Sequence, residues 1–180
     1  PRLAWYADSS NPYSPGLTAI PKTYEWSDLT FPTDRETLLG KSNNNEVRLA
    51  FLPNGTEVAV KLFGHAIVTD GRPEDDMNAC LLAGDNPNVV GGLGKILNTP
   101  DGRQAMVMSL LPKDYAQVAN PPSFATICHD TYPGGTVYSQ AYILNAARTL
   151  ATGYAHLHSR GIQHGDAYNH NTIGRRDGMC

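Results

Sequence analysis

Apolar and polar residues alternate in two runs of the chain, residues 46–51 (E-V-R-L-A-F) and residues 57–62 (E-V-A-V-K-L). A period of two places successive side chains on opposite faces of a β-strand. The turn residues Pro53-Asn54-Gly55 separate the runs, and Asn-Gly is typical of tight connections between antiparallel strands. The pattern therefore predicts a β-hairpin.

A short helix and two more strands complete the strand-rich half of the chain. Acidic residues and Pro73 in the first turn, with Gly84 after the last, predict a helix over Arg72–Ala83. Apolar residues predict strands over Asn88–Leu97 and Ala105–Leu111, with a Pro-Asp-Gly turn between them.

The clearest helix is expected over Tyr138–His158, after a polar, proline-broken connection over Pro112–Pro122. Its apolar side chains recur every three or four residues and so share one helix face: Tyr142, Ala146, Leu150, Tyr154 and Leu157. The order of elements predicts an α+β fold, with a small antiparallel-sheet lobe over residues 23–111 and a helical lobe over residues 112–180.

Composition narrows the choice of partners. The 180 residues include 14 basic and 17 acidic side chains, a net charge of -3 without a basic block, so we expect no nucleic-acid partner. No apolar run approaches the roughly 20 residues of a membrane helix. Cys80, Cys128 and Cys180 lie far apart without paired spacing, which favours a reducing, cytoplasmic setting over a disulfide framework or zinc site.

Residues 1–22 contain several prolines and predict no regular element. Leu3-Ala4-Trp5 and Asn11-Pro12-Tyr13-Ser14 resemble the closing turn of a leucine-rich repeat array. One partial repeat fits that cap and an ordinary linker equally well, because repeats are identified by their period.

The strongest chemical motif is H-G-D-A-Y-N-H-N at residues 164–171, directly after the long helix. It resembles the catalytic loop of protein kinases, H-R-D followed by four residues and Asn. The resemblance implies that Asp166 accepts the proton of the attacking hydroxyl, that Asn171 is a magnesium ligand, and that His164 braces the loop backbone. It also implies ATP and Mg²⁺ as cofactors and a protein-kinase-like fold whose helical lobe is only partly present.

Val58-Ala59-Val60-Lys61 resembles the V-A-I-K strand of the same family. Alternation puts Ala59 and Lys61 on one face, where a small residue leaves room for a nucleotide and the lysine reaches its phosphates. A family lysine is held by an acidic residue of the following helix. Asp76 lies nearest the expected place and Glu74 is the alternative, while both could also be ordinary first-turn helix charges.

The nucleotide-covering elements match the family less well. Gly40 and Val47 fit the phosphate-covering pattern G-x-G-x-x-G-x-V, but Ser42 and Asn45 stand at its other glycine positions. The resemblance places the adenine edge at 108–111, from Met108 at the rear of the pocket to Leu111. An apolar core strand would give the same pattern there.

The leading hypothesis is ATP-dependent phosphoryl transfer to a protein hydroxyl. Two alternatives stay open: a non-catalytic pseudokinase that binds a partner, and a small-molecule phosphotransferase, since H-G-D also resembles the aminoglycoside and choline phosphotransferases. The family's D-F-G motif is expected about a dozen residues after Asn171, beyond Cys180. We therefore expect the sequence to be part of a longer chain, and these residues alone to be inactive.

Overall fold

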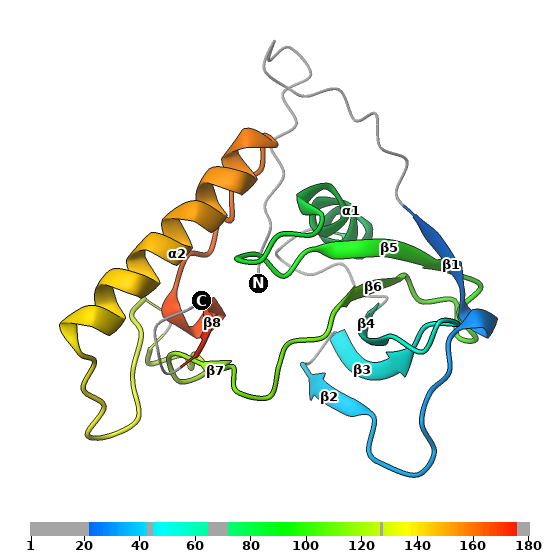
Figure 1. Cartoon of the computed structure of the whole chain (residues 1–180), viewed down its shortest axis with the longest axis horizontal. Coiled ribbons are helices and arrows are strands. Elements are labelled where there is room, and N and C mark those ends of the chain that lie inside the picture. Colours follow the sequence, from blue (N-terminus) through cyan, green and yellow to red (C-terminus); the bar gives the residue numbers. More distant parts are fainter. Residues whose placement is uncertain (1–21, 43–44, 65–71, 127, 176–180) are drawn as a thin grey trace.

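A computed structural model describes residues 22–42, 45–64, 72–126 and 128–175. It has an α+β fold, as predicted, built on a six-stranded sheet of order β1-β5-β6-β4-β3-β2 that is antiparallel except between β1 and β5 (Figure 1). The strands of this sheet are β1 (Thr23–Glu25), β2 (Leu38–Lys41), β3 (Asn45–Phe51), β4 (Glu57–Phe63), β5 (Gly92–Leu97) and β6 (Ala105–Ser109). Except for Lys22, the proposed cap or linker over residues 1–22 lies outside the described residues.

The predicted hairpin is confirmed as β3 and β4. Their register runs from the pair Asn45–Phe63 to the pair Phe51–Glu57 without a shift. The turn closes where the Gly55 N–H donates to the Leu52 carbonyl at 2.8 Å, and Gly55 has a φ of 81°, which a residue without a side chain adopts at little cost. The Asn-Gly pattern therefore fixed both the turn and the faces of the strands.

The sheet buries a different hydrophobic cluster on each face. One face packs Val58, Val60 and Leu62 of β4 against β5 and β6 and is covered by aromatic residues of β1 and of the one-turn helix η1 (Trp26–Asp28). The opposite face packs Phe63 and the β6 residue Met106 against helix α1 (Pro73–Ala83). Residues of opposite parity along β4 thus serve opposite faces, as a period of two requires.

Helix α1 ends where the sequence predicts and begins one residue later, at Pro73, because Arg72 before it is extended. Pro73 occupies its first turn, and Gly84 ends it with a φ of 65°. The strand expected over Asn88–Leu97 begins later, at Gly92, because residues 86–89 form a turn in which the Asn88 N–H donates to the Asn86 side chain at 2.9 Å. The strand expected over Ala105–Leu111 likewise ends at Ser109.

Strands β7 (Ala116–Gln117) and β8 (Ile173–Gly174) form a second, two-stranded sheet, and helix α2 (Gln140–Ser159) lies between them along the chain. The connection predicted as irregular over Pro112–Pro122 therefore contains a strand. The end of α2 packs Leu157 against Ala83 at the end of α1, and a ring nitrogen of His156 lies 2.8 Å from the Ala83 carbonyl oxygen. Figure 1 shows α2 inclined away from the large sheet, with η2 (Asn169–Asn171) and β8 beside it.

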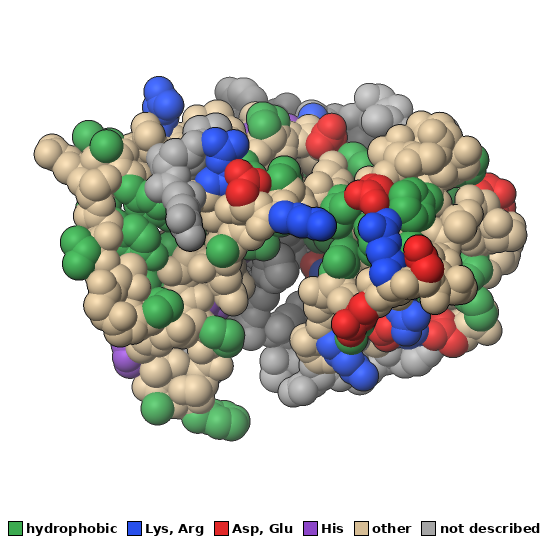
Figure 2. Space-filling model, turned by 60° about the horizontal axis from the view of Figure 1, so that its bottom comes forward, with side chains coloured by type: hydrophobic (Ala, Val, Ile, Leu, Met, Phe, Trp, Pro, Cys, Tyr) green, Lys and Arg blue, Asp and Glu red, His purple; other side chains and the backbone are tan. Residues whose placement is uncertain are grey.

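The predicted apolar stripe of α2 faces the protein, but a second apolar strip does not. Leu157 is buried and Tyr142, Leu150 and Tyr154 are half-buried, whereas Ile143 and Leu144 are exposed. Between the parts built on the large sheet and on α2, the surface in Figure 2 is hollowed. Within the described ranges, no helix combines the length and hydrophobicity needed to cross a membrane.

A close backbone approach fixes the junction of α1 and β5. A Cβ atom added at Gly91 would lie 1.8 Å from the carbonyl oxygen of Gly84, which no side-chain movement can relieve. We expect Gly91→Ala to lower the free energy of unfolding by about 1–3 kcal/mol, since the turn would have to move away from α1. Urea unfolding measures this change.

Gly134→Ala is the matched control, because a Cβ atom there meets nothing within 4 Å. Equal stability of the two variants would contradict the proposed packing.

Candidate functional site

An ion pair joins the central strand of the sheet to helix α1. Lys61 Nζ on β4 lies 2.8 Å from Asp76 Oδ2 on α1, and the two side chains are 9% and 27% exposed. Of the two acidic residues that the sequence left open, Asp76 makes this contact, and Glu74 is exposed on the first turn. Because water is largely excluded from Lys61, the Asp76 carboxylate is the group that compensates its buried charge.

Two more groups surround the pair. The Lys61 ammonium lies 4.3 Å from the centre of the Phe63 ring, close enough for a cation–π contact. The Cys80 thiol lies 3.7 Å from the other oxygen of Asp76. Burial, together with the neighbouring Asp76 charge, outweighs the opposing effect of the Lys61 charge and raises the pKa of Cys80 to about 12, so the thiol is neutral at physiological pH.

The residues predicted to contact a nucleotide share the α1 face of the sheet. Lys61 pairs across the strands with Val47 of β3 and with Met106 of β6, and Ala59 pairs with Met108. Residues paired directly across strands point to the same side. Val47, Ala59, Lys61 and Met108 therefore form one contiguous surface, with Asp76 above it on α1.

The predicted phosphate-covering segment is the hairpin of β2 and β3. Gly40 lies in β2, paired with Val47, and a Cβ atom at Gly40 would meet nothing within 4 Å. Ser42 and Asn45 close the turn: the Ser42 N–H donates to the Asn45 carbonyl, and the Asn45 N–H donates to the Ser42 hydroxyl. Leu111 is half-buried, two residues beyond the end of β6.

The second group of predicted residues lies in the loop after α2. The Asn171 side-chain amide donates to the main-chain oxygen of Asp166 at 2.9 Å and to its carboxylate at 2.7 Å. His164 Nδ1 accepts a long hydrogen bond of 3.4 Å from the Asp166 N–H. Burial lowers the pKa of His164, which therefore stays neutral and can accept that bond.

Asn171 is suited to bind a cation. Its amide nitrogen is held by two oxygens of Asp166, and its Oδ1 accepts no hydrogen bond from the part of the chain that the structure describes. An amide oxygen is the kind of ligand that a hard cation such as Mg²⁺ binds. Among the described residues, no group of three or more His, Cys, Asp or Glu side chains could hold a metal ion.

Sequence reasoning missed Asp130, a partly buried carboxylate that contacts this loop. Its two oxygens accept hydrogen bonds from the backbone N–H groups of Asn169 and His170, at 2.7 and 3.0 Å. Burial alone would raise the pKa of Asp130, but these hydrogen bonds and the His170 ring outweigh it and lower the pKa. No local pattern connects Asp130 to a loop 39 residues later.

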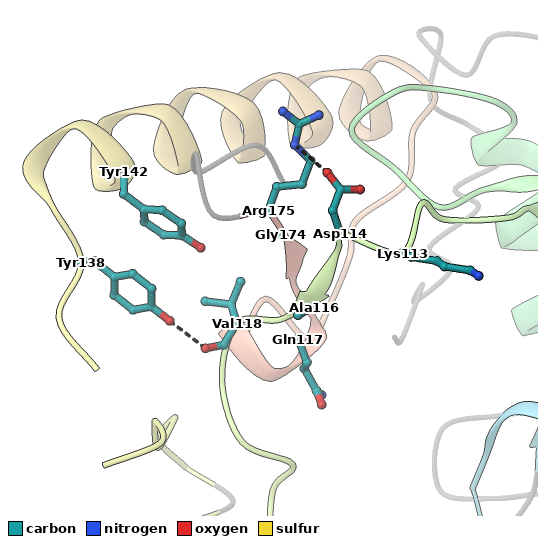
Figure 3. Close-up of a pocket in the computed structure, with 9 residues that line it drawn as sticks. All are labelled: Lys113, Asp114, Ala116, Gln117, Val118, Tyr138, Tyr142, Gly174 and Arg175. Atoms are coloured by element: carbon teal, nitrogen blue, oxygen red, sulfur yellow. Dashed lines mark hydrogen bonds and ion pairs between the residues drawn. The ribbon is translucent and has the colours of Figure 1, made fainter. Parts of the chain in front are cut away.

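A cavity of about 670 Å³ lies between the β7–β8 pair and the start of α2 (Figure 3). The Tyr138 hydroxyl donates to the Val118 carbonyl at 2.9 Å. Arg175 and Asp114, which both line the cavity, form an ion pair with 3.5 Å between Nε and Oδ2. None of the predicted site residues lines it; its walls are Lys113, Asp114, Ala116, Gln117, Val118, Tyr138, Tyr142, Gly174 and Arg175.

The predicted site residues thus form two groups, one on the sheet and α1, the other on the loop after α2. Within the described ranges, no hydrogen bond or ion pair joins Lys61 or Asp76 to Asp166 or Asn171. Searches with the sequence match no family model and no curated protein. The chemistry of the site is therefore argued from its geometry.

Breaking the buried ion pair should cost stability. We expect Asp76→Ala to lower the free energy of unfolding by about 2–3 kcal/mol, near the lower end for a buried pair, because Asp76 is 27% exposed. Most of that loss should be recovered in the double variant Lys61→Met/Asp76→Ala, because it no longer contains an unpaired buried charge. A double-mutant cycle measures this recovery.

Asp75→Ala is the control for the loss of a helix charge, since Asp75 is exposed on the same turn. It should cost less than about 1 kcal/mol. Equal losses for Asp75→Ala and Asp76→Ala would contradict the role of the pair.

Cys80 should resist alkylation in the folded protein. With its pKa raised to about 12, its thiolate population is small at pH 8, whereas Cys128 is exposed. We expect iodoacetamide to modify Cys128 on the order of a thousandfold faster than Cys80. Mass spectrometry of the two peptides measures the rates, and denatured protein, in which both react, is the control. Similar rates in the folded protein would contradict this arrangement.

Proposed function

We propose that this chain forms the ATP-binding part and the catalytic loop of a kinase-like fold that transfers a phosphoryl group to a protein hydroxyl. The observation that carries the proposal is the buried ion pair of Lys61 and Asp76. Burying a charged lysine in the central strand of a sheet costs free energy, which a paired carboxylate offsets only in part. A lysine kept there at this cost suggests that its charge has a use, such as binding the phosphates of a ligand.

The order of the elements supports the proposal. A hairpin (β2–β3), a lysine-bearing strand (β4) and a helix carrying its carboxylate partner (α1) follow one another along the chain. In protein kinases the phosphate-covering loop, the lysine and its acidic partner come in the same order. Ala59 and Met108, side by side on the same face, would then border the adenine.

The loop after α2 supplies the groups that phosphoryl transfer needs. Asp166 would accept the proton of the attacking hydroxyl. The Asn171 amide would hold Asp166 in place through its hydrogen bond to the Asp166 carboxylate. Mg²⁺ would neutralise charge on the phosphates, held from the protein side by the free Oδ1 of Asn171. His164 would brace the loop at the backbone N–H of Asp166.

Two departures bear on turnover. Ser42 and Asn45 close the turn of the covering hairpin with their own hydrogen bonds, so the backbone approaches phosphate less freely than a glycine loop does. Tyr168 stands where serine/threonine kinases usually carry a lysine beside the transferred phosphate; it stacks on His170, with ring centres 5.2 Å apart, and carries no positive charge. Both features favour slow chemistry.

Gly165 supports a second candidate, transfer to a small-molecule hydroxyl. Its φ is 74°, a conformation that an arginine would adopt only with strain. The backbone of H-G-D therefore differs from the one that H-R-D adopts without strain, and the H-G-D motif itself resembles that of the aminoglycoside and choline phosphotransferases.

Calorimetric titration with ATP tests the proposal. The chain should bind ATP more tightly with Mg²⁺ than without it, and Lys61→Met should weaken binding about tenfold to a hundredfold, the effect of losing one charge-assisted contact. Asp166→Asn should leave ATP affinity nearly unchanged, because the role assigned to Asp166 is proton transfer and not nucleotide binding.

Lys113→Met, a variant of an exposed lysine outside the proposed site, is the control and should bind as the unaltered chain does. No ATP binding, or equal binding by Lys61→Met, would overturn the proposal. If phosphate is transferred to aminoglycosides or choline and not to a protein such as casein, the second candidate replaces the first.

A further inference from the structure

The segment between β7 and α2 holds the loop that carries Asn171. One carboxylate, Asp130, accepts the N–H groups of two successive residues, Asn169 at 2.7 Å and His170 at 3.0 Å. The His170 ring adds a third contact, with Nδ1 2.9 Å from the same carboxylate. Three contacts to one planar group leave the backbone of these residues little freedom to rotate.

These contacts are protected from water. The side chains of Asp130 and His170 are 13% and 9% exposed, so water competes weakly for the hydrogen bonds. The Tyr132 hydroxyl accepts a hydrogen bond from the Asn169 side chain at 2.6 Å. The Gln117 side chain donates to the His170 carbonyl at 2.5 Å.

The segment that carries Asp130 is itself fixed to the rest of the protein. The Asn120 N–H donates to the Thr131 carbonyl at 2.8 Å, next to Asp130 in the chain. The rings of Tyr132 and Tyr138 meet edge to face, with centres 6.0 Å apart, and Tyr138 is bonded to Val118. Because these contacts hold the segment of Asp130 in place, Asp130 fixes the position of the loop and does not move with the loop.

We propose that Asp130 is a positioning residue for the magnesium-binding loop, an inference that rests on the proposed function. It holds the backbone of Asn169 and His170 so that the next residue, Asn171, keeps its amide nitrogen on Asp166 and its Oδ1 free for the metal. Asp130 touches neither nucleotide nor metal. Its effect reaches the site only through the backbone that it fixes.

The test compares Asp130→Asn and Tyr132→Phe with the unaltered chain. Asp130→Asn replaces one acceptor oxygen by a donor that faces an N–H group, whereas Tyr132→Phe removes only the contact to the Asn169 side chain and preserves the ring. Asp114→Asn is the matched control: it neutralises an exposed carboxylate near β7 that pairs with Arg175 and does not contact the loop. Circular dichroism checks that each variant is folded.

The first measurement is hydrogen exchange of the Asn169 and His170 amides, which needs no ligand. Exchange in Asp130→Asn should be at least about tenfold faster than in the unaltered chain, since both amides lose a charged acceptor. Helix α1 should exchange as before. Asp114→Asn should show no change in either region.

The second measurement is the gain in ATP affinity on adding Mg²⁺. A tenfold smaller gain, with unchanged affinity for metal-free ATP, is the expected result for Asp130→Asn, and a smaller loss of the same kind for Tyr132→Phe. If Asp130 had only a structural role, Asp130→Asn would lower the affinities for ATP with and without Mg²⁺ equally, or would change neither. If Asp130→Asn does not fold, Tyr132→Phe alone decides, by the same two measurements.

The outcomes separate this inference from the proposed function. If the unaltered chain gains no ATP affinity from Mg²⁺, the proposed function fails and the positioning role fails with it. If the unaltered chain gains affinity and Asp130→Asn gains as much, only the positioning role is overturned. Unchanged exchange of the two amides in Asp130→Asn also overturns it.

Discussion

The arrangement of the sheet and helix α1 depends on one buried charge pair. Lys61 lies in the central part of the sheet, nearly inaccessible to water, and Asp76 of α1 supplies its counter-charge. Without α1 at this rotation and distance, Lys61 would be a buried charge without a partner, which costs several kcal/mol. The pair therefore ties the position of α1 to the face of the sheet on which Val47, Ala59 and Met108 lie.

Helix α2 packs at the far end of the same helix. Gly84, where α1 ends, touches Gly91 so closely that no side chain fits, and a Cβ atom at Gly153 of α2 would lie 2.8 Å from the Asn88 carbonyl oxygen. The turn between these glycines is thus enclosed by α1 and α2. Its packing fixes α2, and the loop that follows α2 carries Asp166 and Asn171.

Local patterns predicted the parts of the structure that depend on neighbours in sequence. The hairpin of β3 and β4 and the ends of α1 followed from Asn-Gly, Pro and Gly positions, because turns and helix ends are decided within a few residues. The parallel pairing of β1 with β5 did not follow, since a three-residue strand has no measurable period. Spacing along the chain also left Asp76 and Glu74 open, because it does not specify how α1 is rotated against the sheet, and it could not reveal Asp130.

The central claim is that Lys61 and the loop of Asp166 and Asn171 serve one nucleotide. Nuclear magnetic resonance with a titration of magnesium-bound ATP tests it most directly, because each backbone amide reports separately. We expect the signals of Ala59, Lys61 and Asn171 to shift together along one binding curve. Shifts confined to one of the two groups, or signals that follow different affinities, would contradict it.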